Sequence, residues 1–207
     1  ADTMGEMARL KEEGKVRFVG CSNFGKQDLK ALLDVDHVEV NQVAYSLLFR
    51  AIEYDIVPLC KEHQVSIAPY SPLMHGILTG KFGTIEDIPD GRARTRHFSS
   101  DRPMTRHGQE GAEAETAQAL ADIQRICEEA GLPMVKVALA WLLERPGVTT
   151  VIAGARNPKQ ITSNAEAASM ELPDDVVEAL TEATEPLKAK LGPNADMWET
   201  EEESRIR

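Results

Sequence analysis

Short apolar strands alternate with amphipathic helices along most of this chain, and this alternation constrains its fold more than any other feature. The pattern predicts strands over 16–21, 38–43, 65–68 and 148–152. The predicted helices cover 4–13, 26–33, 53–64, 113–130, 135–145, 158–168 and 174–185. Buried-type strands that alternate with helices are typical of βα units and a parallel sheet. We therefore expect an α/β fold with about four parallel strands and flanking helices.

Two segments depart from this alternation. Residues 82–108 contain five arginines together with glycine, proline and serine, and they show little apolar periodicity. A connection of this length is usually a functional lid or is disordered, and we interpret it as an arginine-rich lid loop. Residues 192–207 form a polar, largely acidic tail. The rest of the chain fits either an open four-stranded sheet or part of a (β/α)8 barrel.

Composition and charge exclude several classes of function. The net charge of −11 and the isoelectric point near 5.0 produce a field that repels phosphate backbones, so we expect no nucleic-acid or anionic-membrane partner. Cys21, Cys60 and Cys127 are outside any metal-ligand spacing, which indicates free thiols in a reducing compartment and no metal site. No apolar run is long enough to span a bilayer. We therefore expect a cytoplasmic protein.

The segment 149–164 contains the most informative functional signal. A β-branched run ends at Gly154, and a helix that carries Gln160 and Asn164 begins a few residues later. Backbone N–H groups at a helix N-terminus favour an anion, and Arg156 adds a planar fork that suits a phosphate or a stacked base. Taken alone, the segment fits a phosphate site and an ordinary strand-to-helix turn equally well.

Polar and aromatic side chains stand at the ends of the other predicted strands, where ligands gather in parallel βα architectures. Ser22 and Asn23 follow the first strand, Gln42 lies in the second, and Tyr70 follows the third. Hydroxyl and amide groups can pair with a carboxamide, and a tyrosine can stack on a heteroaromatic ring. The glycine-containing loop 71–81 can present backbone N–H groups to a pyrophosphate. These features match the successive parts of a nicotinamide dinucleotide.

Four motifs, in order and at matching spacing, resemble the aldo-keto reductase superfamily. They are Gly20–Phe24, Asn41–Ser46, Tyr70–Lys81 and Gly154–Asn164. The third has the form YSPL-x-x-G-x-L-T-G-K, which is similar to the bacterial and plant branch of the superfamily. The resemblance covers essentially the whole chain, so residues 1–207 would form one partial barrel. It implies the C-terminal half of a (β/α)8 TIM barrel that binds NADPH without a Rossmann domain; neither GxGxxG after the first strand nor GxxxxGK[ST] occurs here.

The resemblance also implies a role for each residue of the nicotinamide and pyrophosphate sites. Ser22, Asn23 and Gln42 would hold the nicotinamide carboxamide, and Tyr70 would stack on the ring. The residues implied to line the pyrophosphate are Ser71, Leu73, Gly76, Leu78, Gly80 and Lys81.

For the other end of the cofactor, the resemblance implies a site for the adenosine and its 2′-phosphate. Its residues are Gly154, Arg156, Gln160 and Asn164. Arg156 would decide the preference for NADP over NAD. Some of the lid-loop arginines Arg92, Arg94 and Arg96 would close over the cofactor.

The family's catalytic Asp, Tyr, Lys and His belong to the first four strands of the barrel, and by this resemblance the chain begins in the helix after the fourth. We therefore assign no catalytic residue. We expect the chain to come from a longer reading frame. The complete protein would be an NADPH-dependent oxidoreductase that reduces a small aldehyde or ketone to an alcohol, and this chain would supply its cofactor-binding half without reducing carbonyls alone.

Two alternative functions remain open. The first is a stand-alone half-barrel that pairs through its open sheet edges and works as a nucleotide-binding module. The second is a regulatory subunit that senses redox state through bound cofactor. The carbonyl substrate and the oligomeric state do not follow from the sequence.

Three further side chains have more than one interpretation. His75 lies inside the pyrophosphate-type loop, where it either takes part in chemistry or is simply solvated. Tyr45 either touches substrate at the pocket edge or packs at a strand end. Trp198 in the tail either covers the mouth of the barrel, binds a neighbouring subunit or is exposed.

Overall fold

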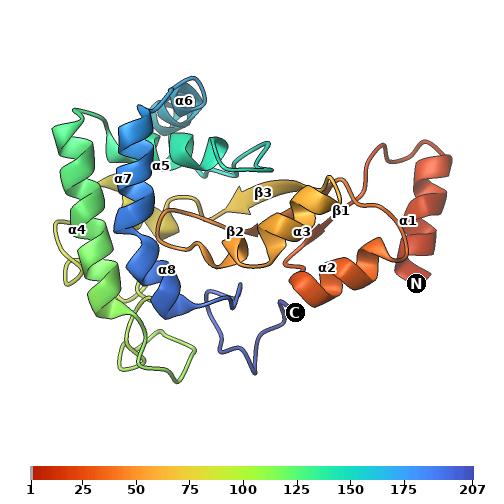
Figure 1. The fold of residues 1–207 in the computed structure, drawn as a ribbon, viewed down its shortest axis with the longest axis horizontal. Helices are drawn as coiled ribbons and strands as arrows, with labels where there is room; N and C mark the ends of the chain where they lie inside the picture. Colours follow the sequence, from red (N-terminus) through yellow and green to blue (C-terminus); the bar gives the residue numbers. More distant parts are fainter. Residues whose placement is uncertain (1) are drawn as a thin grey trace.

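The architecture is given by a computed structural model, which describes residues 2–207 (Figure 1). The strands are β1 (Gly20–Ser22), β2 (Val40–Ala44) and β3 (Ser66–Tyr70). The helices are α1 (Asp2–Glu12), α2 (Lys26–Leu33), α3 (Ile56–Glu62), α4 (Glu113–Glu129), α5 (Met134–Leu143), α6 (Pro158–Ala167), α7 (Asp174–Ala183) and α8 (Glu185–Leu191), with short 3₁₀ segments η1 (Ala51–Glu53) and η2 (Met74–Thr79). The predicted α/β class is confirmed.

The strands form one parallel sheet in the order β1-β2-β3. Ser22 pairs with Gln42, and Ala44 pairs with Tyr70. The connections from β1 to β2 and from β2 to β3 are therefore crossovers, each of which brings the chain back to the end of the sheet where the preceding strand began. This register brings the carboxyl ends of all three strands to one edge.

The expectation of about four strands is wrong for the described residues, because the segment 148–152 does not form a regular strand. It lies parallel to β3 and makes one bridge, from Val148 to Ile67. The next ladder position on β3 is Pro69, which has no N–H to donate. The bond that resumes the pairing runs from the Ile152 N–H to the Pro69 carbonyl at 2.9 Å, one residue later than a regular parallel ladder would place it. The proline therefore interrupts the ladder.

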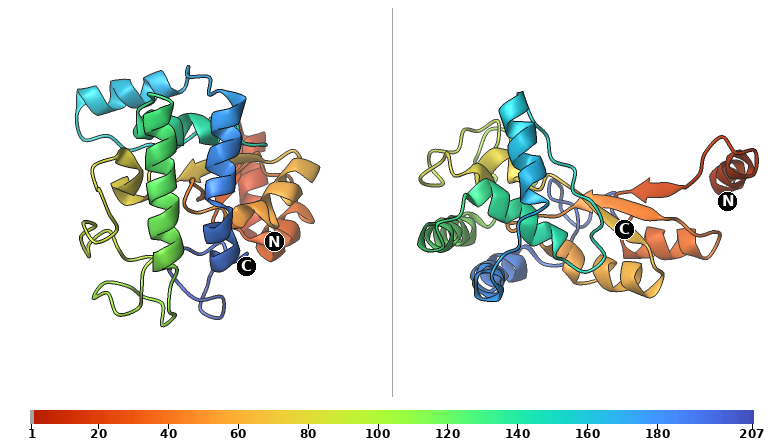
Figure 2. Two further views of the ribbon diagram at one scale, coloured as in Figure 1. Left: turned by 60° about the vertical axis from the view of Figure 1, so that its left-hand side comes forward. Right: turned by 90° about the horizontal axis from the view of Figure 1, so that it is seen from above.

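The molecule is unevenly covered along the sheet. Figure 2 shows α2 and α3 on one side of the strands and α1 standing apart at the far end of the molecule. β1 is the outermost strand, and its residues Gly20 and Ser22 are exposed. Its outer edge has no strand partner within residues 2–207. A sheet of three parallel strands with flanking helices and an open edge is consistent with a partial barrel.

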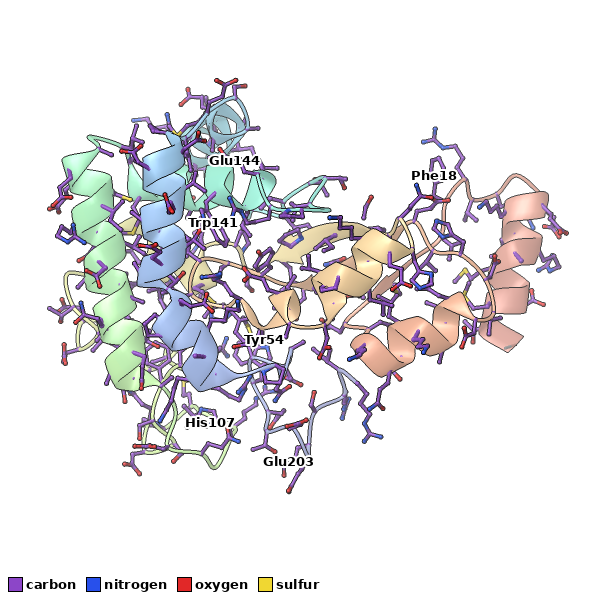
Figure 3. All side chains as sticks on the ribbon, in the orientation of Figure 1. Phe18, Tyr54, His107, Trp141, Glu144 and Glu203 are labelled. Carbon is purple, nitrogen blue, oxygen red and sulfur yellow. The ribbon has the colours of Figure 1, made fainter. Side chains whose placement is uncertain are left out.

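The apolar core lies between the sheet and the helices α4, α5 and α7. Trp141 of α5 is fully buried, and its indole N–H donates to the hydroxyl of Thr181 in α7 at 3.2 Å (Figure 3). Tyr45 packs edge-to-face on the Trp141 ring, with the two centroids 5.8 Å apart, and donates its hydroxyl proton to Glu53 at 2.8 Å. Tyr45 is thus a core residue, which supports strand-end packing over substrate contact.

The middle of the 82–108 segment is packed against the body of the protein. Ala93, Thr95, His97 and Phe98 are each fully buried. The Nε2 of His97 donates to the carbonyl of Leu48 at 2.8 Å, so its Nδ1 accepts from the Thr95 hydroxyl at 2.9 Å. These bonds fix the loop to the segment that follows β2.

The tail of residues 192–207 is held at both ends. The Arg96 guanidinium donates to three tail-side carbonyls, those of Leu191, Asn194 and Asp196, at 2.7–3.0 Å. At the other end, the Asp28 N–H in the first turn of α2 donates to the Arg207 carbonyl at 2.9 Å. The tail therefore runs from α8 to the start of α2 (Figure 1). No helix within residues 2–207 has both the length and the apolarity needed to cross a bilayer.

Candidate functional site

The polar residues predicted at the strand ends lie together in the structure. The Ser22 hydroxyl and the Asn23 N–H both donate to the carbonyl of Gln42, at 3.1 and 2.9 Å. The Tyr70 hydroxyl donates to the Asn23 side-chain oxygen at 2.9 Å. Asn23 has a positive φ of 59°, a conformation that asparagine tolerates better than most residues. The four residues thus lie together at one edge of the sheet, where Gln42 takes part through its main-chain carbonyl.

The phenol of Tyr70 stays protonated in this cluster. Burial raises its pKa, and the negative charge of Asp196 in the tail raises it further, against the opposing effect of the hydrogen bond to Asn23. A neutral, half-buried tyrosine ring offers a flat surface for stacking and is not poised to exchange a proton near pH 7.

A second group of predicted residues lines one pocket of about 900 Å³. The pocket lies between the 71–81 loop, residues 91–94 of the 82–108 segment, and the corner that leads into α6. Eight residues implied by the motifs belong to its wall, namely Ser71, Leu73, Gly76, Lys81, Gly154, Arg156, Gln160 and Asn164. Residues from three distant parts of the sequence therefore meet at a single cavity.

Two residues of the predicted pyrophosphate site lie outside this wall. The Leu78 side chain is fully buried in the core. Gly80 ends η2 with φ of 75°, a left-handed conformation that glycine adopts without steric cost. The Leu78 side chain therefore packs in the core and fixes the loop to it. Gly80 turns the chain just before Lys81, which lines the pocket.

The pocket wall is strongly cationic, although the protein as a whole is acidic. Lys81, Arg92, Arg94 and Arg156 line it, and no carboxylate does. None of the four forms an ion pair with any residue among 2–207. Partial desolvation and the charges of Arg92 and Arg156 lower the pKa of Lys81. Concentrated positive charge without counter-ions is the environment that attracts an anionic ligand.

The corner before α6 is built to present its backbone to the pocket. Asn157 caps the helix, because its side-chain oxygen accepts the Gln160 N–H at 3.0 Å. The Gln160 side chain in turn accepts the Arg156 N–H at 2.8 Å, in an arrangement related to a capping box. Asn164 donates to the Gly154 carbonyl at 3.2 Å. These three bonds fix the backbone that carries the Arg156 side chain.

Several wall residues were not predicted from the sequence. Thr79 and Ser163 add hydroxyl groups, and Val135 and Ile152 add apolar surface. Ser163 lies three residues after Gln160 on α6, so helical spacing would have identified it. Val135 comes from α5 and enters the wall only through tertiary packing.

Arg92 and Arg94 of the 82–108 segment reach the pocket, whereas Arg96 holds the tail and does not line it. Arg92 donates to the carbonyl of His75.

The cysteine and metal expectations concern other parts of the structure. Burial raises the pKa of Cys21 to about 11, so this thiol is protonated at neutral pH. Among residues 2–207, no three His, Cys, Asp or Glu side chains gather as a potential metal site.

Comparison with known proteins gives one family over most of the chain. The model of the aldo/keto reductase family matches residues 1–185. The NADH-specific methylglyoxal reductase of Escherichia coli is 29% identical over 189 residues, which cover 91% of this chain and 55% of that protein. The aldo-keto reductase yakc [NADP(+)] of Schizosaccharomyces pombe is 27% identical over 198 residues, 93% of this chain and 56% of that protein.

A solved structure supports the same relationship. The glycerol dehydrogenase of Gluconobacter oxydans superimposes with a TM-score of 0.69 at 26% sequence identity, over 91% of this chain and 54% of that one. The chain thus spans about half the length of the curated relatives that it matches.

Proposed function

This chain belongs to the aldo/keto reductase family, and on that premise we propose that it supplies the nicotinamide-dinucleotide-binding half of an oxidoreductase. The observation that carries the proposal is the pocket in which Lys81, Arg92, Arg94 and Arg156 converge without a carboxylate. A dinucleotide with a pyrophosphate and a 2′-phosphate has the negative charge that such a wall requires.

The residues present fit this cofactor at both of its ends. A Cβ at Gly154 would meet no heavy atom within 4 Å, so the backbone at the α6 corner is open to a ligand. At the other end, the Asn23 side-chain amide is bonded to the Tyr70 hydroxyl, and Gln42 lies next to Asn23 through its main-chain carbonyl. The span from the strand ends to α6 passes along the 71–81 loop, which suits an extended dinucleotide.

We assign the chain's residues the following roles. Ser22, Asn23 and Gln42 hold the nicotinamide carboxamide, and Tyr70 packs on the ring and shields it from water. The pyrophosphate lies against the loop that carries Ser71, Leu73, Gly76, Leu78, Gly80 and Lys81, where Leu78 and Gly80 shape the backbone. The adenosine and its phosphate lie against Gly154, Arg156, Gln160 and Asn164.

The reaction of the complete protein is the reduction of a small aldehyde or ketone to an alcohol. Bound NADPH supplies the hydride. This chain positions the nicotinamide and excludes water from one of its faces, because Tyr70 and the strand-end amides surround it. We assign no proton donor within these residues, since the tyrosines Tyr45 and Tyr70 both have raised pKa values. The proton donor belongs to the part of the family's barrel that this chain does not match.

We propose NADP over NAD as the cofactor. The relatives include an NADH-specific and an NADP(+)-linked enzyme, so membership in the family is compatible with either cofactor. The preference here rests on Arg156, whose backbone N–H is bonded to Gln160 and whose side chain lines the pocket without an ion-pair partner among residues 2–207. A guanidinium in this state suits a 2′-phosphate dianion better than a ribose hydroxyl.

Competition between cofactor fragments tests this assignment. The 207-residue chain is titrated with NADPH by cofactor fluorescence, and bound NADPH is then displaced with adenosine 2′,5′-bisphosphate or with adenosine 5′-monophosphate. The proposal predicts displacement by the bisphosphate at a concentration at least about tenfold lower than by the monophosphate, since a charged hydrogen-bonded contact is worth about 1.5–3 kcal/mol. Equal displacement by the two fragments would contradict the 2′-phosphate site.

A further inference from the structure

Trp198 in the tail contacts the wall of the cationic pocket, which is the pocket lined by Lys81, Arg92, Arg94 and Arg156. Trp198 lies with its ring 5.0 Å from the His75 ring, and the Arg94 guanidinium lies 5.2 Å from the Trp198 ring centroid. Both His75 and Arg94 line the pocket. Trp198 therefore packs behind two wall residues that come from different loops.

Arg94 depends on this contact for its position. It forms no ion pair with any described residue between 2 and 207, and its Nε is buried without a hydrogen-bond partner there. The face of Trp198 is thus the interaction that orients the Arg94 side chain within the described structure. A cation over an indole face is attracted by the ring quadrupole, and Arg94 contributes to the pocket wall from this position.

His75 is held in an unfavourable backbone conformation. Its φ is 53°, and that of the preceding residue, Met74, is 42°. Two consecutive non-glycine residues with positive φ persist only where the surroundings fix them. The surroundings here are Arg92, which donates to the His75 carbonyl, and Trp198, which packs against the ring. Burial, and then the charges of Arg94 and Arg92, lower the pKa of His75, so the ring is neutral at pH 7.

Trp198 is itself fixed by the tail. Its backbone N–H donates to the Asp196 carboxylate at 2.9 Å, and the carbonyl of Asp196 accepts from Arg96 at 2.8 Å. Asp196 also accepts from the Ser204 hydroxyl at 3.3 Å. The Trp198 backbone is therefore held through Asp196 by residues that do not line the cationic pocket.

We propose that Trp198 is a positioning residue for the phosphate wall: it orders Arg94 and His75 for the dinucleotide and slows release of the bound cofactor. This inference rests on the proposed function and adds to it a tail residue that sets the lifetime of the complex. It acts through Arg94, because ordering the guanidinium before binding removes part of the entropy that binding would otherwise cost.

The test compares NADPH affinity and dissociation rate in Trp198→Ala, Trp198→Phe and wild-type chains. Trp198→Ala is expected to raise the dissociation constant about fivefold, mostly through faster release, because a cation–π contact of this kind has about that worth. Trp198→Phe keeps an aromatic face and is expected to stay within about twofold of wild type. Phe18→Ala, which truncates an exposed aromatic residue at the other end of the molecule, is the matched control and is expected to bind as wild type.

A double-mutant cycle separates positioning from general stability. If Trp198 acts through Arg94, then Arg94→Met and Trp198→Ala each weaken binding, and the double variant is weakened little more than Arg94→Met alone. Multiplicative losses, or an unchanged release rate in Trp198→Ala, would overturn the inference while wild-type binding still supports the proposed function. Failure of the wild-type chain to bind NADPH at millimolar concentration would overturn both.

Discussion

Arg156 is the residue on which the preference for a phosphorylated dinucleotide depends. We predict that Arg156→Ala raises the dissociation constant for NADPH at least about tenfold and leaves that for NADH within about twofold, because only NADPH carries the group that the guanidinium pairs with. Both constants are measured by cofactor fluorescence at one ionic strength. Lys159 is the matched control, since it is a cation in the first turn of α6, close to Arg156 in sequence, that does not line the pocket. An equal loss from Lys159→Ala would mean that net charge, and not a local contact, sets the affinity.

At the scale of single residues, the motifs named many of the polar groups that line the cationic pocket and few of the residues that support them, and the role of these groups in binding a dinucleotide stays a prediction. Arg156, Gln160 and Lys81 could be named because their chemistry and their place after strands are local properties. Leu78 belongs to the same motif, but its side chain faces the core, and a motif does not show which way a side chain points. Trp198 is about 120 residues from His75 in sequence, so nothing short of the fold could bring them together.

At the scale of segments, Arg96 connects the 82–108 loop to the tail. We predict that Arg96→Met lowers the free energy of unfolding by at least about 3 kcal/mol, since it removes three charged hydrogen bonds and leaves buried carbonyls without a donor. Limited proteolysis should then cut the tail earlier than in wild type. Arg106→Met is the control, because Arg106 is an exposed arginine of the same loop. Equal resistance of the two variants to cleavage would show that Arg96 does not hold the tail.

His97 makes the stability of the same loop depend on pH. The pKa of His97 is lowered to about 3, mainly by burial and further by the charge of Arg96. The hydrogen bond to the Leu48 carbonyl opposes this shift. A depressed pKa means that the unfolded chain binds the proton first. The stability due to neutral His97 is therefore complete above about pH 6.5 and is lost as the pH falls toward 3, at up to about 1.4 kcal/mol per pH unit.

Urea unfolding at pH 7, 5.5 and 4.5 measures this dependence. Wild type should lose stability over this range. Part of the loss should disappear in His97→Gln, because glutamine provides a side-chain hydrogen-bond donor and acceptor but does not titrate. Carboxylates such as Glu53, whose pKa is lowered by its bonds to Arg50 despite the opposing effect of burial, contribute a background common to both proteins. Identical pH slopes in the two proteins would rule out His97 as the titrating group.

Element boundaries show why the sheet was predicted one strand too large. The run around Val148 has the β-branched composition of a buried strand, and it does lie along β3. Pairing, however, is a property of two segments, and the partner contains Pro69, which cannot donate. The helices were easier to predict, since a helix satisfies its own backbone and its amphipathic period is visible within a single segment.

At the scale of the whole molecule, the distribution of charge differs from what the net charge suggests. The chain has a net charge of −11, yet the pocket of about 900 Å³ is lined by four cations and no carboxylate. The acidic exterior repels nucleic acids, whereas the pocket attracts a small anion at short range, where screening by the outer charges matters less. Pairing through the open edge of β1 stays a prediction, and the chain spans about half the length of the relatives that it matches.

The central claim is that this chain holds a nicotinamide dinucleotide in an extended, phosphate-selective site. Parallel titrations of the purified 207-residue chain with NADPH and NADH, followed by cofactor fluorescence, test it most directly. We predict saturable one-site binding of NADPH, with an affinity at least about tenfold above that for NADH. Absence of binding of either dinucleotide at millimolar concentration would contradict the account.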